Sequence, residues 1–260
     1  MKKSIRTIIA MLLCFIALFT NVSKGVAKEN YDSILQKIGT PQTVIDEMDE
    51  GYKEYICNNL EPDESYQSYE VQDVGTSSGM MSRAVSSLTS SDMKVSIFAS
   101  GVKLNGEKCV KLYPSFAWKK SANLYNDTFA FALYSGWDCI PDINASLTVN
   151  AINSNGVVQQ TRTLTPSDAA ESGYAFQFPK ECKKLPGGGY YEGYAYFYAR
   201  RKKSSATKAI SIKYVHDSSP SNSVSYGISI GPASISLSSS SSKLQVFAKN
   251  MSFSYSYSTK

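Results

Sequence analysis

Apolar residues recur at two different spacings along the chain, and the two spacings predict two kinds of structure. Between residues 31 and 60 they return every three or four positions, which is typical of one face of a helix. From residue 92 onward apolar and polar residues alternate in short runs, which is typical of half-buried strands. The helical stripe consists of Tyr31, Ile34, Leu35, Ile38, Val44, Ile45, Met48, Tyr52, Tyr55, Ile56 and Leu60.

Turn-forming residues divide the N-terminal stripe into a small helical hairpin. Gly39 follows the first helix as a stop, because glycine readily takes the left-handed conformation that ends many helices. Thr40 and Pro41 predict a new helix start, with Thr40 as the N-cap and Pro41 at the first helical position. Asp49 predicts the cap of a last helix from about Glu50 to Asn59.

Turn signals also divide the alternating part into many short strands. Asn105-Gly106 and Asn155-Gly156 each separate two strand-like runs, as hairpin turns do. Pro114 predicts a bulge or an edge strand, because proline cannot donate to a ladder. Thr165–Asp168 predicts a single helical turn. Further strand-like runs are Lys108–Trp118, Phe129–Tyr134, Ala145–Ile152, Val157–Leu164, Tyr190–Tyr198, Ala209–His216, Ser223–Ile230, Ala233–Leu237 and Leu244–Tyr257.

This order of elements contains no sequence repeat and no strand–helix–strand alternation. We therefore predict a mainly β protein, an antiparallel β-sandwich with a small N-terminal helical hairpin. The predicted boundaries are a helical hairpin at residues 28–60, a linker at 61–91 and a β-sandwich domain at 92–260. The linker contains one edge strand around Tyr69–Val74.

The first 27 residues have the pattern of a removable secretory signal. Lys2, Lys3 and Arg6 form a positive start, and the apolar run Ile8–Phe19 is too short to span a bilayer. Small residues up to Ala27 provide a cleavage site, so we predict a signal peptide at residues 1–27 and a secreted protein. The alternative is a short anchor that stays uncleaved.

The net charge depends mainly on this signal. The whole chain carries +5, and residues 1–27 contain four basic residues and no acid, so the rest carries 5 − 4 = +1. A nearly neutral protein is a poor partner for nucleic acid, which we exclude. No later apolar stretch approaches the ~20 residues of a membrane-spanning helix, so no transmembrane segment is expected after signal cleavage.

Cysteines remain at four positions after the signal: Cys57, Cys109, Cys139 and Cys182. An even number in an exported protein favours disulfides, and the wide spacing argues against a zinc site. If the run ending at Trp118 pairs antiparallel with the run that begins at Asp127, Cys109 comes within two or three residues of the position opposite Cys139. This register predicts a Cys109–Cys139 disulfide and leaves Cys57–Cys182.

Four stretches of the chain resemble a family of uncharacterised secreted proteins from Gram-positive, Bacillus- and Clostridium-like bacteria. They are Leu35–Leu60, Tyr113–Trp118 (YPSFAW), Asp127–Trp137 (DTFAFALYSGW) and Tyr214–Ile230 (YVHDSSPSNSVSYGISI). The resemblance implies an N-terminal helical segment before a β-sandwich body. It implies no known activity, so no functional residue is carried over from it.

Candidate catalytic residues are few. His216 is the single histidine, and the chain has neither a G-x-S-x-G nor an H-E-x-x-H motif. Asp127, Asp138 and Asp142 are candidates for the paired carboxylates of a glycosidase, but each lies near turn-forming residues, where aspartate commonly bonds its own backbone. We therefore expect no catalytic residues, no metal site, no cofactor and no enzyme activity.

Candidate binding residues are aromatic or basic. Tyr194, Tyr196 and Tyr198 lie on one face of a predicted strand, while Ala195, Phe197 and Ala199 lie on the other face. Exposed tyrosines and tryptophans can stack on sugars or anchor a protein partner, although a Tyr-rich face can also simply cover a sandwich. The complete candidate set is Trp118, Trp137, Tyr194, Tyr196, Tyr198, Arg200, Arg201, Lys202 and Lys203.

The last four of these residues form the densest charge cluster of the chain. On a predicted hairpin tip, they suit anionic cell-wall polymers or lipid head groups, or they are merely solvated. We therefore expect a non-enzymatic protein that binds a cell-surface polymer, a glycan or an extracellular protein. Two alternatives remain: a membrane-active, pore-forming toxin or bacteriocin-like protein that uses the Ser-rich alternation of residues 223–237, and an extracellular hydrolase.

Overall fold

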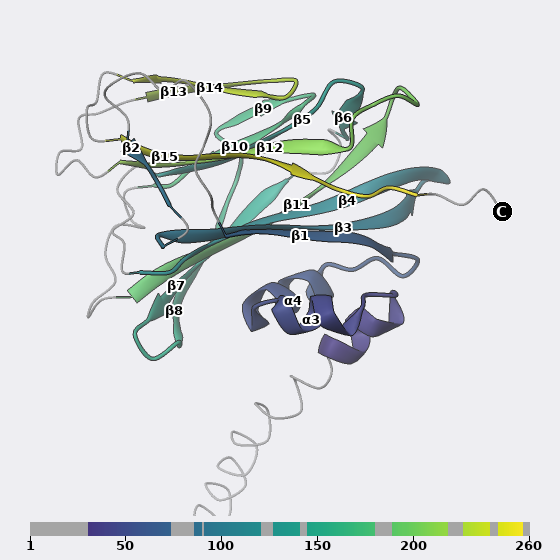
Figure 1. Cartoon of the computed structure of the whole chain (residues 1–260), viewed down its shortest axis with the longest axis horizontal. Helices are drawn as coiled ribbons and strands as arrows, with labels where there is room; N and C mark the ends of the chain where they lie inside the picture. The colour runs from purple at the N-terminus through teal and green to yellow at the C-terminus, as the bar shows by residue number, and fades with distance from the viewer. Residues whose placement is uncertain are drawn as a thin grey trace, which may run out of the picture. The chain divides into compact units, whose positions relative to one another are not determined.

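The computed structural model describes residues 31–73, 86–89, 91–120, 127–140, 145–179, 189–217, 226–239 and 244–256. The chain divides into two compact units, Met1–Leu60 and Glu61–Lys260. The predicted signal peptide and the predicted helical start before residue 31 lie outside the described residues. Figure 1 shows the described helices in the first unit and the strands in the second.

Helices make up the described part of the first unit. A helix over residues 31–37 is followed by α3 (Gln42–Glu47) and α4 (Glu50–Asn58). Gly39 has φ +91°, so the predicted left-handed stop is confirmed. The stripe predicted from the sequence turns inward, because Leu35, Ile45 and Ile56 are fully buried.

The predicted cap at Thr40 is wrong by one residue. Pro41 is the N-cap of α3, and its carbonyl accepts hydrogen bonds from the amides of Val44 and Ile45 at 3.0 and 3.1 Å. The hydroxyl of Thr40 is buried and has no partner within the described residues. Asp49 is the N-cap of α4 as predicted, although its side chain makes no capping hydrogen bond.

Two sheets and a separate two-stranded hairpin form the described part of the second unit. The seven-stranded sheet has the order β1 (Ser65–Asp73), β3 (Met93–Leu104), β4 (Glu107–Trp118), β11 (Gly189–Arg201), β7 (Ser146–Asn153) and β8 (Val158–Leu164), with β6 (Trp137–Cys139) also paired to β11. The six-stranded sheet has the order β2 (Ser86–Ser87), β15 (Leu244–Ser252), β12 (Ala209–Asp217), β5 (Thr128–Leu133), β10 (Gly173–Gln177) and β9 (Asp168–Ala170). The hairpin consists of β13 (Tyr226–Gly231) and β14 (Ser234–Ser239).

Neighbouring strands run antiparallel in both sheets, with the short β2 as the exception among the described pairs. β2 lies parallel to β15 over two residues. The edge strand predicted inside residues 61–91 is β1, which begins at Ser65, four residues earlier than predicted, and pairs with β3 at one end of its sheet.

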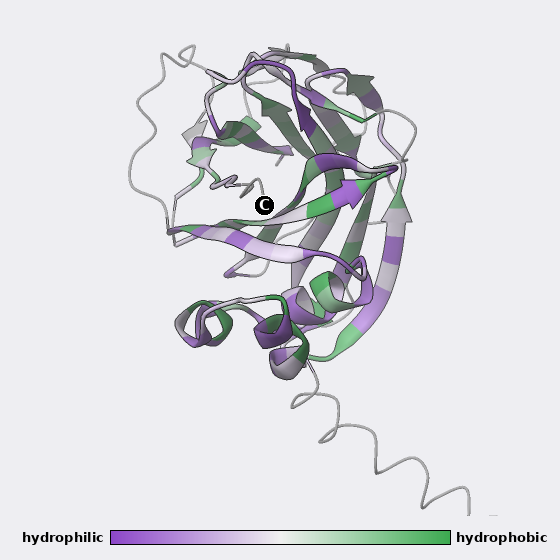
Figure 2. Ribbon diagram, turned by 90° about the vertical axis from the view of Figure 1, so that its right-hand side faces the viewer, coloured by the Kyte–Doolittle hydropathy of each residue, from purple (hydrophilic) through white to green (hydrophobic). Residues whose placement is uncertain are grey.

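An aromatic core joins the two sheets. Phe116 of β4 lies 5.1 Å from Phe129 of β5 and 4.8 Å from Tyr214 of β12, measured between ring centroids. Phe131 of β5 stacks on Phe197 of β11 at 4.7 Å. Figure 2 shows apolar and polar residues alternating along several strands, as expected when one face of each sheet meets this core. The predicted β-sandwich is therefore confirmed.

Hairpin turns were predicted better than strand partners. The turn Asn105-Gly106 joins β3 to β4 with φ values of 51° and 84°, so the predicted positive-φ turn is confirmed. Asn155-Gly156 joins β7 to β8 as predicted. The predicted helical turn at Thr165–Asp168 is wrong, because Asp168 already begins strand β9.

Pro114 occupies a central strand rather than the predicted edge or bulge. In β4 it lies opposite Ile97 of β3, while β11 runs along the other side of β4. The register between β11 and β4 is the same at Ser115 as at Leu112, but the pairing is interrupted between them. The ladder therefore has a gap where the proline lacks its N–H group.

The predicted pairing of the β4 run with the β5 run is wrong, and with it the argument for a Cys109–Cys139 disulfide. β4 and β5 belong to different sheets. Val110 and Cys139 lie opposite Ala199 on its two sides, so β11 separates β4 from β6. Two strand spacings amount to roughly 9.6 Å, beyond the roughly 7 Å limit for a disulfide.

The thiols of Cys57, Cys109 and Cys139 are free in the structure. Cys139 packs in the core between the sheets, whereas Cys109 packs with Val102 and Tyr198 on the other face of its sheet. The thiols of Cys109 and Cys139 therefore also point to opposite faces. Cys182 lies outside the described residues, but the free thiol of Cys57 contradicts the predicted Cys57–Cys182 disulfide.

Candidate functional site

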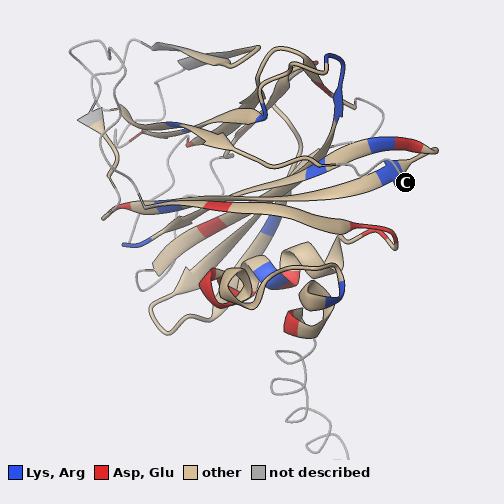
Figure 3. Ribbon diagram, turned by 45° about the vertical axis from the view of Figure 1, so that its right-hand side comes forward, with Lys and Arg blue, Asp and Glu red and all other residues tan. Residues whose placement is uncertain are grey.

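The densest group of exposed charge lies on the connection from β11 to β12. The segment 200–208, called the basic loop below, begins with the last two residues of β11 and contains Arg200, Arg201, Lys202, Lys203 and Lys208 and no acidic residue, and all five basic residues are exposed. It runs from the seven-stranded to the six-stranded sheet, so the predicted hairpin tip is wrong. Figure 3 shows it as a blue segment at the end of β11.

Hydrogen bonds to a neighbouring turn hold the basic loop in place. The carbonyl oxygen of Gly136 accepts from the amides of Lys202 and Lys203 at 2.8 and 3.4 Å. Gly136 has φ +93°, and a Cβ atom at this position would lie 2.8 Å from the Cβ of Ala206. Only glycine fits this turn, because the loop packs directly on its α-carbon. The loop backbone is thus ordered before any ligand arrives.

Acidic neighbours neutralise two of the five basic residues. Arg200 pairs with Glu107 at 3.1 Å, and Lys202 pairs with Asp138 and with Glu171, the latter at 3.8 Å. The side-chain hydrogen bond from Lys202 to Asp138 raises the pKa of Lys202, so this ammonium stays charged. The basic partner of each pair is exposed, so these ion pairs contribute little to stability.

Arg201, Lys203 and Lys208 form no ion pair within the described residues. The guanidinium of Arg201 lies 5.7 Å from the ring centroid of Tyr255, which orients it without neutralising its charge. The basic loop therefore presents three cations that no acid of the described chain neutralises. Lys208 was missed in the sequence because four residues without charge separate it from the Arg200–Lys203 cluster.

The predicted tyrosine row lies on one face of β11 but is not an exposed platform. Tyr194 and Tyr198 are buried at 3% exposure, and Tyr196 is half-buried. Tyr194 donates a hydrogen bond to Glu192, and Tyr198 donates one to Glu61 at 2.7 Å. The hydroxyls of Tyr194 and Tyr198 are already used within the protein, and their rings are inaccessible to a sugar.

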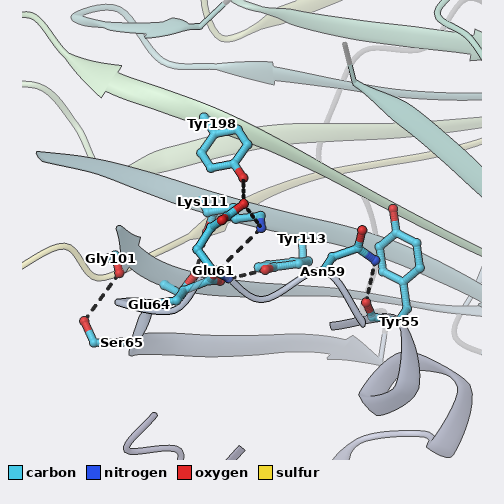
Figure 4. Close-up of polar contacts among 10 residues, drawn as sticks. Tyr55, Asn59, Glu61, Glu64, Ser65, Gly101, Lys111, Tyr113 and Tyr198 are labelled. Atoms are coloured by element: carbon cyan, nitrogen blue, oxygen red, sulfur yellow. Dashed lines mark hydrogen bonds and ion pairs between the residues drawn. The ribbon is translucent and has the colours of Figure 1, made fainter. Parts of the chain in front are cut away.

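The same face holds a buried lysine surrounded by aromatic rings. Lys111 is 1% exposed, and its ammonium lies 4.7 to 5.2 Å from the ring centroids of Tyr113, Tyr196 and Tyr198. It also lies 3.4 Å from Glu64 and 3.7 Å from Glu61. Figure 4 shows Lys111, Tyr113 and Tyr198 directed toward these two glutamates.

Hydrogen bonds complete this lysine cluster. Tyr113 donates to Glu64 at 2.6 Å, and Ser100 donates to the same carboxylate. Burial lowers the pKa of Lys111, and the charges of Glu64 and Glu61 oppose that shift. No sequence pattern pointed to this arrangement, because Glu64 and Lys111 are far apart along the chain. The cluster fixes the segment from Glu61 to Glu64 on the sheet.

The two predicted binding tryptophans belong to the core. Trp118 is 3% exposed, and its indole N–H donates to the hydroxyl of Tyr214 at 3.1 Å. Trp137 is 2% exposed and packs against Phe253 and Tyr255 at ring-centroid distances of 5.2 and 5.5 Å. Neither ring is accessible to a ligand, so their predicted role in stacking is wrong.

Two of the weighed catalytic candidates meet in the structure. Nδ1 of His216 lies 3.0 Å from both carboxylate oxygens of Asp127. Tyr214 donates to the same carboxylate at 2.7 Å, and the rings of Trp118 and His216 meet edge to face with centroids 5.1 Å apart. Asp127 is fully buried and His216 is 8% exposed. This arrangement joins strand ends to the core. Asp142, the third candidate of the carboxylate set, lies outside the described residues.

Among the described residues, no group of three or more His, Cys, Asp or Glu residues is arranged so that it could hold a metal ion. None of the helices in that part of the chain is long and apolar enough to cross a membrane.

Comparisons with known proteins give only remote similarities. No protein-family model matches the chain, and no curated protein matches it in sequence. A collagen-binding domain of a Staphylococcus aureus adhesin matches at TM-score 0.30 and 7% identity, covering 58% of this chain and 95% of that one. The collagen-binding subdomain of the Enterococcus faecalis surface protein ACE matches at TM-score 0.30 and 9% identity, covering 56% and 88%.

A pore-forming protein matches over a longer part of the chain. Its TM-score is 0.30 and its identity 8%, covering 75% of this chain and 95% of that one. All three TM-scores are too low to define a shared fold. No function is transferred from these proteins.

Proposed function

We propose that this chain is an exported, non-enzymatic β-sandwich protein that attaches to an anionic extracellular polymer through the basic loop. The proposal rests on one observation. Arg201, Lys203 and Lys208 are exposed on an ordered backbone and pair with no acid of the described chain. A cell-wall polyphosphodiester has the matching chemistry, with regularly spaced negative charges in an extended chain.

Order in the loop supports this function. Binding a flexible segment requires that its backbone be ordered first, which weakens the complex. Here the hydrogen bonds to Gly136 and the contact with Ala206 already fix the positions of the cations. Attraction between exposed charges depends strongly on salt, which gives the proposal a clear signature.

The arrangement around His216 supports a structural role over a catalytic one. The carboxylate of Asp127 receives hydrogen bonds from Tyr214 and from the backbone amide of Asp217, in addition to its contact with Nδ1 of His216. A carboxylate committed to several internal partners and fully buried is typical of a core network. Export rests on the sequence of residues 1–27 and belongs to the same proposal.

Retention of the protein on immobilised wall teichoic acid tests the proposal. The variant combines Arg201→Ser, Lys203→Ser and Lys208→Ser, which leaves both ion-paired residues of the loop in place. We expect retention to fall about a hundredfold at low salt, since each cation near an anionic surface contributes roughly a fivefold factor. Retention of the unmodified protein falls as salt rises from about 0.1 M to about 1 M.

A matched control removes the same charge elsewhere. Lys37→Ser, Lys103→Ser and Lys119→Ser also change the net charge by −3, and all three positions are exposed. This control retains binding if the loop is the site. Equal losses in the two triple variants would mean that only net charge matters, and unaltered retention of the loop variant would refute the proposal.

A second candidate function, a membrane-active protein, is favoured by one observation. The β13–β14 hairpin is a sheet of its own, and Ile230 and Ile235 pack it onto Ala130, Ala132 and Ala175. A hairpin outside both main ladders can leave the body without breaking their strand pairing. Release of dye from lipid vesicles would support this function, and intact vesicles would exclude it.

A further inference from the structure

The end strands of the two sheets differ in how they are covered. Beside β1, the amides of Ser252, Ser254 and Ser256 donate to side chains of Glu70, Ser68 and Gln67 at 2.6, 2.8 and 2.9 Å. In the six-stranded sheet, the end strands β2 and β9 have two and three residues. β8 has seven residues and pairs only with β7 among the described strands. Among the end strands of that part of the chain that lack such contacts with a neighbouring segment, β8 is the longest.

The surface of β8 lacks the charges that usually protect such an edge. Arg162 is its one charged residue, and the strand reads VQQTRTL. Val157 and Val158, at its start, are both 49% exposed. An exposed edge of this length, with little charge and without proline, is a ready template for another strand.

We propose that β8 pairs antiparallel with β8 of a second copy of this chain, about a twofold axis at Thr161. The sequence of β8 itself indicates that the partner strand is a second copy of β8. In this register Thr161 faces Thr161, and Arg162 faces Gln160 of the second copy on both sides of the axis. Within one copy, Gln160 can accept a hydrogen bond from Arg162 at 2.9 Å when its amide is turned so that the oxygen faces the guanidinium, and the pairing forms the same contact between copies.

Other registers of the same pairing fit less well. Opposed residues of an antiparallel pair point to the same face, so a twofold axis normal to the sheet must pass through a residue. An axis at Arg162 would set two arginines directly opposite each other. An axis at Thr163 would set Arg162 against the apolar Leu164. Thr161 avoids both conflicts.

The backbone and the faces of β8 agree with this register. On the core side, Gln160 and Arg162 line a small hollow with Val149, Ala151 and Tyr191. On the other side, the hydroxyl of Thr161 donates to Asn150 at 2.8 Å. The register of β8 with β7 shifts between Gln160 and Val158, so an axis at Gln160 would bring this bulge into the central pairs. With the axis at Thr161, the bulge lies outside the three central pairs.

This pairing would join two seven-stranded sheets into one continuous sheet. It does not depend on the basic loop, so it can succeed or fail separately from the proposed function. Two linked copies would carry two basic loops, and simultaneous attachment to one polymer would raise the apparent affinity. A single strand from each copy makes a small interface, so we expect a reversible dimer.

Sedimentation of the protein over a range of concentrations tests the proposal, with no polymer present. Thr161→Lys places two lysines opposite each other at the axis, whereas Thr163→Lys places each lysine opposite the neutral Gln159. We expect Thr161→Lys to weaken the dimer roughly fivefold or more, and Thr163→Lys to leave it nearly unchanged. Both positions are exposed on the same face of the strand.

Two more variants complete the design. Thr161→Val removes the hydrogen bond to Asn150 without adding charge, so it keeps the dimer and controls for that loss. Gln160→Glu places a carboxylate opposite Arg162 and strengthens the dimer. A monomer at all concentrations up to the solubility limit would overturn the proposal. Equal effects of the two lysine variants would contradict the register centred on Thr161. They would also contradict the proposal that β8 of a second copy is the partner strand.

Discussion

Nδ1 of His216 lies 3.0 Å from both carboxylate oxygens of Asp127, and the pair is enclosed by Tyr214 and Trp118. Asp127 stands just before β5 and His216 near the end of β12, so the contact ties neighbouring strand ends together. This contact links the protonation of one residue to the stability of the β body.

The first prediction is that stability falls as the pH rises past about 6.5. Burial alone lowers the pKa of His216, but the hydrogen bond and charge of Asp127 outweigh it and raise the pKa above its usual value. Because the folded pKa exceeds the unfolded pKa of about 6.5, the stabilisation is complete below about pH 6.5 and is lost as the pH rises through the folded pKa. Denaturant unfolding at several pH values measures this slope.

His216→Gln serves as the control, since it cannot take up the proton. Its unfolding free energy should vary less over the same pH range. The imidazole of the single histidine can also be titrated directly by NMR. A measured pKa below the usual value would contradict the attraction to Asp127.

The second prediction contrasts the two tryptophans. Trp118→Phe removes the donor to the hydroxyl of Tyr214, whereas the N–H of Trp137 has no acceptor within the described residues. We expect Trp118→Phe to cost about 1 kcal/mol more than Trp137→Phe, because a buried hydrogen bond is lost only at Trp118. Thermal or denaturant unfolding compares them. A larger loss at Trp137 would be inconsistent with this difference.

The third prediction concerns the buried lysine cluster. Lys111→Met leaves the buried carboxylate of Glu64 without its cation and should destabilise the protein by about 3–5 kcal/mol. Adding Glu64→Gln removes that charge and should restore part of the loss, as a double-mutant cycle would measure. Lys103→Met, at an exposed position of β3, is the control and should have little effect. Additive losses at Lys111 and Glu64 would show that the two side chains do not interact.

The fourth prediction concerns the support of the basic loop. Gly136→Ala combines an unfavourable positive φ with a contact of 2.8 Å to Ala206, so it should displace the loop and weaken polymer binding. Gly156→Ala also has a positive φ, but its added Cβ meets nothing within 4 Å. We expect about 1–3 kcal/mol of destabilisation from backbone strain in both, with a loss of binding only at Gly136. If the polymer retains the two variants equally, an ordered basic loop is not required for binding.

Local patterns predicted most of the longer strands, missed β6, β9 and β10, and could not predict which strands pair. Alternation reports which residues face the core, and Asn105-Gly106 reports a tight turn, because both depend on neighbouring residues. The partner of β4 depends on distant parts of the chain. β11 lies far beyond β4 in the chain and nevertheless pairs with it, whereas β5, the next predicted run, joins the other sheet.

The residues of the candidate site also fall into two groups, those that a local pattern predicts and those that depend on distant parts of the chain. The exposed charge of Arg200–Lys203 could be inferred directly from the sequence, since four consecutive basic residues leave no apolar position among them to bury. The burial of the Tyr194–Tyr198 row could not, because alternation gives the face of a strand but not what covers it. The burial of Lys111 also escaped prediction, because its stabilisation needs Glu61, Glu64 and three tyrosines brought together by folding.

NMR titration with a soluble wall teichoic acid examines the role of the basic loop without any substitution. If the loop is the attachment site, shifts of backbone amides concentrate at residues 200–208 and at Gly136, and they diminish as salt is raised. Shifts concentrated on other exposed surfaces, or none at low salt, would contradict attachment through the basic loop.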